Sequence, residues 1–238
     1  MKERPILFSG SMVRAILDCR KTMTRRIVKP QPFFDDRGLL WWHWSKNAGS
    51  ANIEPVGSPS EEWLARCPYG VAGDRLWVRE TAKCGYRSEQ PPQNKGCIGV
   101  DYQAAGSLMR NYALDRRDDY PWFPSRSHNV DGAIRWAPAI HMPRWASRIA
   151  LEVTGVWVER LQDISYEDAL AEGVSDFAAT LTDEERNAVG ETPEQTARRL
   201  EWPQRQYRLL WDSINAARGY GWDVNPWVWV VEFERIEA

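Results

Sequence analysis

The strongest constraint on the fold is an alternating apolar pattern in residues 147–161, SRIALEVTGVWVERL. Ile149, Leu151 and Val153 recur at every second position, which places them on one face of an extended strand. Gly155 interrupts the alternation, and a glycine inside a strand marks a bulge or a bend. The pattern therefore predicts one long strand that is bent or bulged at Gly155.

Several shorter segments have the character of further strands, because they are rich in β-branched and aromatic residues and are bounded by turn residues. They are residues 4–8, 27–28, 75–81 and 227–233. In the third segment, the alternation places Leu76 and Val78 on one face and Trp77 and Arg79 on the other. These segments supply the neighbours that the long strand needs.

Helices are expected at both ends of the chain. Apolar residues at helical spacing predict a helix over residues 11–19. A second helix is expected to begin after Ser165, a favourable N-cap, and to end at Gly173. Two more are predicted within residues 182–200 and at about 203–216.

Residues 33–68 and 83–145 are rich in Pro, Gly and Asn and show no clear periodicity. We interpret them as two loop-rich insertions in a single domain that spans residues 1–238. Few helices and several strands that are not adjacent in sequence predict an α+β fold. The expected form is a small mixed β-barrel with helices covering its openings.

Charge and hydropathy exclude several kinds of partner. The net charge is −2 and the isoelectric point is about 6.0, so duplex DNA is not expected as a partner. No apolar run approaches the ~18 residues of a membrane span. The N-terminus, MKERPILFSG, has too short an apolar segment for a signal peptide. No membrane partner is expected, and the cytoplasm is the expected location.

The cysteines do not suggest a metal site. The chain has four cysteines and three histidines, and no two cysteines form a CxxC pair. A set of Cys67, Cys84, Cys97 and His141 matches no standard zinc spacing. Neither a metal nor a cofactor is therefore expected.

A cluster of cations, CRKTMTRR, occupies residues 19–26, directly after the first predicted helix. A helix that ends here would direct its C-terminal carbonyls at these cations, which is favourable. A solvated helix end is therefore one interpretation. The other is a reactive site, because a turn would set the amine of Lys21 and the hydroxyl of Thr24 three residues apart.

The spacing of Lys21, Thr24 and Arg26 resembles the GxKxxTxR signature of the ASCH superfamily, whose fold is similar to the PUA RNA-binding barrel. Cys19 stands where the signature has its glycine. Three further landmarks occur in the order of that family. They are residues 73–78, residues 151–154 with the helix that follows, and residues 229–233. The whole chain resembles the long, prophage-encoded members of the superfamily.

The resemblance implies an amidohydrolase acting on an N-acylated cytidine-type nucleoside or a related modified base. The small bacterial ASCH enzyme that hydrolyses N(4)-acetylcytidine uses a lysine, a threonine and a glutamate. These correspond to Lys21, Thr24 and Glu172 here, which makes them the catalytic candidates. The substrate-binding candidates are Arg26, Arg25, Trp77 and Arg79.

Two arrangements of the catalytic candidates are open. In one, Thr24 attacks the amide carbonyl with Lys21 as its base, provided that burial and nearby cations lower the pKa of Lys21. Glu172 then orients the lysine or the cytosine amine. In the other, Glu172 activates a water while Lys21 and Arg26 stabilise the oxyanion.

The alternative function is an RNA- or nucleotide-binding module of phage origin, either non-catalytic or ribonucleolytic. The cations would contact phosphate, and one of the 14 tryptophans would stack on a base. The candidates for stacking are Trp42, Trp44, Trp77 and Trp136, and a ribonuclease would need two of His43, His128 and His141. The expected partner is a nucleoside or single-stranded RNA. No oligomeric state is predicted.

Overall fold

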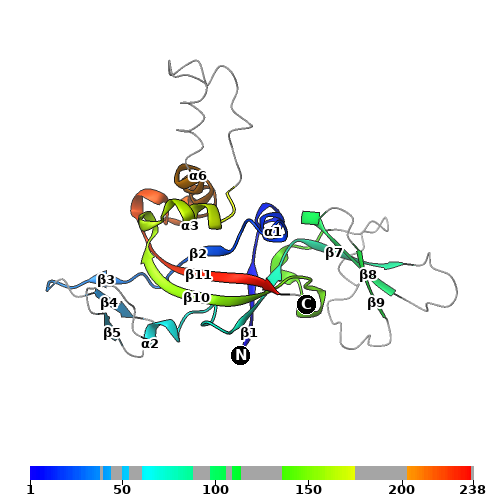
Figure 1. The fold of residues 1–238 in the computed structure, drawn as a ribbon, viewed down its shortest axis with the longest axis horizontal. Coiled ribbons are helices and arrows are strands. Elements are labelled where there is room, and N and C mark those ends of the chain that lie inside the picture. Colours follow the sequence, from blue (N-terminus) through cyan, green and yellow to red (C-terminus); the bar gives the residue numbers. More distant parts are fainter. Residues whose placement is uncertain are drawn as a thin grey trace, which may run out of the picture.

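The computed structural model describes residues 1–37, 40–43, 50–53, 61–87, 97–105, 109–113, 136–174 and 203–236. At its centre lies a five-stranded sheet in the order β1-β6-β10-β11-β2, in which β1 and β6 are parallel and all other neighbours antiparallel (Figure 1). Its strands are β1 (Glu3–Leu7), β2 (Met23–Ile27), β6 (Arg75–Arg79), β10 (Ala150–Arg160) and β11 (Trp227–Ile236). The strands predicted at 4–8, 75–81, 147–161 and 227–233 are confirmed.

The long strand β10 carries the predicted irregularity. Its register against β11 shifts between Val153 and Gly155, which is a β-bulge. A Cβ atom at Gly155 would lie 3.0 Å from Oε2 of Glu232 and 3.4 Å from the Trp157 ring, so the side chains leave little room for a larger residue. The bulge bends β10 and increases the local twist of the sheet.

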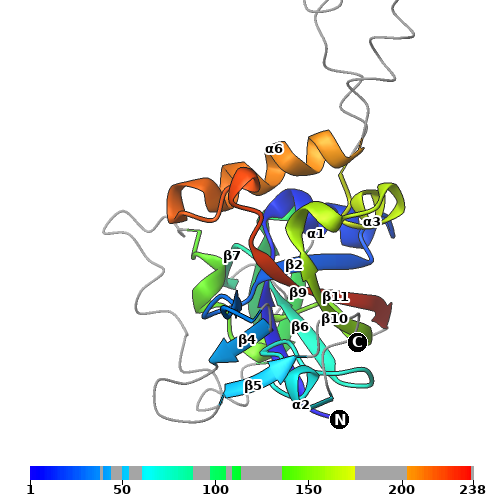
Figure 2. The ribbon, with the colours of Figure 1, turned by 90° about the vertical axis from the view of Figure 1, so that its left-hand side faces the viewer.

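Helices cover both faces of the sheet, and β11 shows how the sheet divides the core. Trp229, Val231 and Phe233 belong to a cluster that includes α1, whereas Val228 and Val230 pack on the opposite face with α3 and α6. The helices are α1 (Gly10–Leu17), α3 (Tyr166–Ala171), α6 (Pro203–Asn215) and a short α2 (Glu61–Leu64). Figure 2 shows α6 lying across the sheet above β2 and β11.

The predicted helix ends agree with the structure at α3. The Ser165 side chain caps this helix by accepting a hydrogen bond from the backbone N–H of Asp168 at 3.0 Å. Gly173 follows the helix with a φ of 78°, a left-handed conformation that favours glycine. The helix predicted within residues 182–200 lies outside the described residues.

The expected closed barrel is not found among the described strands, which form an open sheet with β1 and β2 as its edges. The two edges approach each other through one side chain, since Nη2 of Arg26 donates to the Leu7 carbonyl at 2.6 Å. A side chain therefore stands where a barrel would have a ladder of backbone hydrogen bonds. Alternation in a sequence identifies strands but does not fix which edges pair.

The two segments expected to be irregular contain small antiparallel sheets, so that prediction was wrong. Their strands are β3 (Phe33–Phe34), β4 (Leu40–His43), β5 (Ser50–Ile53), β7 (Ala82–Arg87), β8 (Cys97–Tyr102) and β9 (Met109–Ala113). The two sheets lie at opposite ends of the molecule's long axis (Figure 1). Frequent turn residues interrupt their short strands, which obscures the period of two.

The remaining elements are single turns of 3-10 helix between the strands and helices. They are η1 (Gln103–Ala105), η3 (Ala139–His141), η4 (Arg144–Ala146), η5 (Leu161–Asp163), η7 (Ala216–Arg218) and η8 (Trp222–Val224). Within the described ranges, no helix has the length and apolar character needed to cross a membrane.

Candidate functional site

The cationic signature lies mostly on a strand, because β2 begins at Met23. The expectation of a cationic turn was therefore wrong for Arg25 and Arg26. Alternation along β2 directs Arg25 toward α3 and α6 and Arg26 toward the opposite face. Only Arg20 behaves as a solvated cation, since its exposed side chain pairs with Asp18 at 3.1 Å.

The side chain of Lys21 is completely buried and uses all its donors. Its Nζ donates to the Met23 carbonyl at 2.7 Å, to the Glu172 carbonyl at 2.8 Å and to Oε2 of Glu172 at 2.6 Å. Three short contacts to oxygen fit an ammonium ion, because a neutral amine has only two N–H groups. In this arrangement Lys21 has no free lone pair with which to accept a proton.

The surroundings of Lys21 act on its pKa in both directions. Burial lowers this pKa below its ordinary value, and the positive charges of Arg26 and Arg25 lower it further. The negative charge of Glu172 opposes them. The charge of Lys21 therefore depends on its contact with Glu172, because a buried ammonium without a partner is strongly unfavourable.

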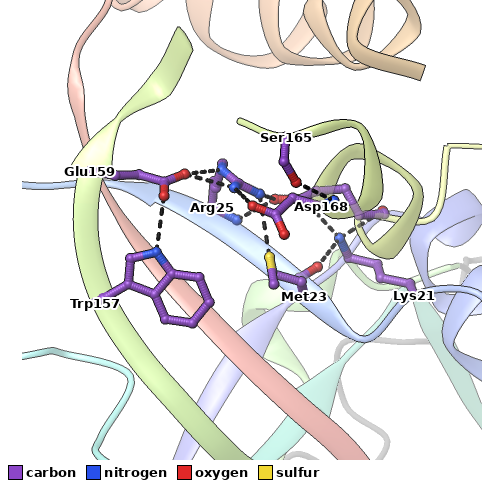
Figure 3. A network of polar contacts seen from close by, with 8 residues as sticks. Lys21, Met23, Arg25, Trp157, Glu159, Ser165 and Asp168 are labelled. Carbon is purple, nitrogen blue, oxygen red and sulfur yellow. Dashed lines mark hydrogen bonds and ion pairs between the residues drawn. The ribbon is translucent and has the colours of Figure 1, made fainter. Parts of the chain in front are cut away.

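Arg25 is the centre of a second set of contacts, drawn in Figure 3, and its side chain is also completely buried. Its Nε donates to Oε1 of Glu159 at 2.8 Å and its Nη2 to Oδ2 of Asp168 at 2.7 Å. Its backbone N–H donates to Oε1 of Glu172 at 2.6 Å. Burial acts against the charged form, but Glu172 and Glu159 raise the pKa of Arg25 above its ordinary value. These contacts fix β2 against α3 and β10.

A cavity of about 680 Å³ opens beside these groups. It reaches both faces of the sheet because β2 is an edge strand. Its lining includes Thr24, Arg26, Trp42, Glu172, Tyr207 and Trp211. The volume lies in the range of small-molecule sites, roughly 300–1,000 Å³. Mixed aromatic and charged walls of this kind suit a planar polar ligand.

Arg26 is half-buried and also lines this cavity. Its guanidinium lies 5.1 Å from the ring centre of Phe8 and 5.9 Å from that of Tyr69. Its Nε is buried and has no hydrogen-bond partner among the described residues. Leaving a buried donor unpaired costs about 1–3 kcal/mol. Because this atom has less than 1 Å² of exposed surface, a ligand would reach it only if the side chain moved.

Tyr207 was missed by sequence reasoning as a functional candidate. It lies on α6, lines the cavity and is buried. Burial and the negative charge of Glu172 raise its pKa well above the ordinary value, so it remains a neutral phenol. Tyr207 falls within the helix predicted at about 203–216, at helical spacing with the apolar residues Leu210, Trp211 and Ile214. The one available signal was that its hydroxyl, unlike a Leu or Ile side chain, needs a polar partner.

The structure brings five of the predicted site residues together and leaves two apart. The group at β2 and the end of α3 consists of Lys21, Thr24, Arg25, Arg26 and Glu172. Trp77 and Arg79 lie on β6, outside the cavity lining, with the Arg79 guanidinium 4.6 Å from the Trp77 ring centre. Of the four tryptophans proposed for stacking, Trp42 lines the cavity, and Trp44 lies outside the described residues.

Comparison with protein-family models, with curated proteins and with solved structures gave no match. The resemblance of residues 19–26 to the ASCH signature therefore stays a prediction.

Proposed function

We propose that the chain is an ASCH-type amidohydrolase that acts on an N-acylated cytidine-type nucleoside. The observation that carries the proposal is the buried contact of 2.6 Å between Lys21 Nζ and Glu172 Oε2, next to Thr24 at the cavity. Lys21 and Thr24 are the residues that match the signature, and Glu172 is the glutamate that the resemblance implies. An open sheet whose two edge strands are joined by a hydrogen bond from Arg26 to the Leu7 carbonyl is compatible with an incompletely closed PUA-like barrel.

The backbone at Cys19 supports the alignment with the signature. Its φ is 58°, in the left-handed region that glycine occupies at little cost. The signature has a glycine at this position. The conformation therefore fits the family pattern even though this chain carries a cysteine there.

The saturated ammonium of Lys21 favours Glu172 as the proton acceptor. In the mechanism we propose, the Glu172 carboxylate takes a proton from a water whose oxygen attacks the acyl carbon. The C–N bond then breaks, and the proton passes from Glu172 to the departing cytosine amine. Lys21 holds Glu172 in position. Thr24, a residue of the cavity lining, orients the water or the acyl group through its hydroxyl.

Arg26 stabilises the oxyanion that forms during this attack. Arg26 is half-buried and lines the cavity, and its guanidinium carries terminal N–H groups besides the buried Nε, which are the donors that an oxyanion would meet. A donor that is fixed in advance stabilises developing charge without reorganisation. Arg25 serves the same reaction indirectly, because its backbone N–H fixes the second oxygen of Glu172.

The direct test is incubation of the protein with N(4)-acetylcytidine, followed by chromatographic detection of cytidine and acetate. We expect turnover, and a loss of at least about 100-fold in Glu172→Gln, which removes the proton acceptor. The matched control is Glu167→Gln, an exposed change in the same helix that should keep full activity. Absence of turnover in the wild-type protein, or unchanged turnover in Glu172→Gln, would contradict the proposal.

A second candidate is binding of a nucleotide or single-stranded RNA without reaction. It is favoured by one observation: both Lys21 and Glu172 use their polar atoms on each other and on β2. Salt-sensitive retention of RNA on a filter, without turnover of N(4)-acetylcytidine, would identify this function instead.

A further inference from the structure

The outer edge of β2 carries unused backbone groups. The Thr22 carbonyl accepts from Phe233 N at 2.8 Å, and Val28 N donates to the Trp227 carbonyl at 3.0 Å. The even-numbered residues of this strand therefore pair with β11. In an antiparallel ladder the residues between them direct their N–H and C=O groups away from that partner. Residues 23, 25 and 27 thus face the outer edge.

Two of the backbone groups on this edge are already occupied. The Met23 carbonyl accepts from Lys21 Nζ, and the Arg25 N–H donates to Glu172. The next two groups along the edge are the C=O of Arg25 and the N–H of Ile27. Neither has a hydrogen-bond partner among the described residues, and both residues line the cavity.

We propose that these two groups recognise the polar edge of a pyrimidine base. The Arg25 C=O accepts a hydrogen bond from the exocyclic N–H at position 4, and the Ile27 N–H donates to the ring nitrogen at position 3. Cytosine presents this donor beside this acceptor, and it does so with or without an acyl group on the amine. The inference rests on the proposed function and specifies how that site selects its substrate.

A base fits this edge better than a peptide strand does. Lys21 and Glu172 block the edge on one side of Arg25, so only a short stretch of free backbone remains. This stretch is too short to pair with an added peptide strand, because strands in proteins usually have at least three residues. A planar ring needs only one acceptor and one donor. The cavity walls supply aromatic side chains for stacking, among them Trp211 and Tyr207.

The ion pairs around Arg25 make the edge rigid. Its guanidinium is held by Glu159 and Asp168, and its N–H by Glu172. The C=O of the same residue is therefore fixed in direction before a ligand arrives. Preorganisation of this kind sharpens discrimination between bases, because a ligand that lacks one partner leaves a fixed polar group unpaired.

The first test uses the wild-type protein and measures equilibrium binding by calorimetry. Cytidine is compared with 3-deazacytidine, which lacks the ring acceptor, and with N(4),N(4)-dimethylcytidine, which lacks the donor. We expect each analogue to bind about 10- to 100-fold more weakly than cytidine. Equal binding of the three nucleosides, or no binding of cytidine, would overturn the inference.

The second test removes the Ile27 N–H. Ile27→Pro deletes a donor that the ladder with β11 does not use, and proline is tolerated on edge strands. Ile27→Ala is the matched control, because it shortens the side chain and keeps the N–H. We expect Ile27→Pro to bind cytidine and 3-deazacytidine equally, and Ile27→Ala to keep the wild-type ratio. If folded Ile27→Pro keeps the wild-type ratio of affinities for cytidine and 3-deazacytidine, the inference is overturned. The comparison of nucleosides on the wild-type protein applies whether or not the proline variant folds.

These binding measurements are separate from the test of hydrolysis. Discrimination among the nucleosides without turnover of N(4)-acetylcytidine would support recognition by the edge and contradict the amidohydrolase. Turnover without discrimination would support the amidohydrolase and overturn recognition by the edge.

Discussion

Arg25 and Arg26 are neighbours in the chain, yet their side chains lie on opposite faces of β2 in opposite surroundings. Arg25 is completely buried and contacts the carboxylates of Glu159 and Asp168. Arg26 lies against Phe8 and Tyr69, and its Nε has no partner in the described part of the chain. One guanidinium is fully compensated, whereas the other keeps a vacant donor.

The difference separates a structural cation from one that is available to a ligand. Removing a compensated buried charge leaves its partners unpaired in a low-dielectric environment, so the cost appears in stability. Removing a cation with a vacant donor costs less in the free protein, and its effect appears when an acceptor is bound. The predictions below test this division.

The largest effect is expected for Arg25→Met. This change leaves the carboxylates of Glu159 and Asp168 without their cation, so the free energy of unfolding should fall by about 3–5 kcal/mol. Urea denaturation measures it. The control is Arg20→Met, at an exposed pair, which should change stability by less than about 1 kcal/mol. Similar losses in both variants would refute the assigned role of Arg25.

Arg26→Met should act mainly on activity. We expect kcat for N(4)-acetylcytidine to fall about 100-fold, because the oxyanion loses its donor. The free energy of unfolding should fall less than in Arg25→Met, since only the contact with the Leu7 carbonyl and the stacking on two rings are lost. A variant that unfolds as readily as Arg25→Met but retains its kcat would reverse the two roles.

The pH dependence of activity distinguishes the two possible roles of Lys21. Its folded-state pKa is lowered from the ordinary value of 10.5, so Lys21 loses its charge at a lower pH than an exposed lysine does. If Lys21 acts as an ammonium ion, kcat should fall as the pH rises through this lowered pKa. A kcat that instead rises over that range would identify Lys21 as the base that deprotonates Thr24.

Stability should respond to the same titration with the opposite sign. Between the lowered pKa of the folded state and 10.5, the unfolded chain binds more protons at Lys21 than the folded chain does. The contribution of Lys21 to the free energy of unfolding therefore increases with pH in this window. The difference in stability between the wild-type protein and Lys21→Met, measured at several pH values, checks the sign.

The smallest effect is expected for Cys19→Gly. The φ of 58° is unfavourable for a cysteine, and glycine adopts it at little cost. We expect a gain of about 1 kcal/mol in the free energy of unfolding, measured by thermal denaturation, and no change in kcat. A loss of stability would mean that the greater freedom of glycine in the unfolded chain outweighs the relief of strain.

Sequence reasoning located most of the central sheet and part of the site. The bulge at Gly155 and the Ser165 cap were predictable because each depends on neighbouring residues. Trp77 and Arg79 were nominated only from their place on a strand, and the pattern could not show that this strand lies outside the cavity lining. Tyr207 was not nominated, because its spacing within the predicted helix matched that of the apolar residues Leu210, Trp211 and Ile214.

The sequence by itself determined the long strand with its bulge, most of the other strands of the central sheet, the cap at Ser165 and the residue types of the candidate site. Only the tertiary structure decided that Arg25 and Arg26 belong to different environments, that the sheet stays open at Arg26, and that Lys21 meets Glu172. Lys21 and Glu172 are 151 positions apart, so their contact depends on where β2 and α3 pack and not on either local pattern. Strand propensity and capping act over a few residues, whereas the pairing of buried charges is set by the packing of whole elements.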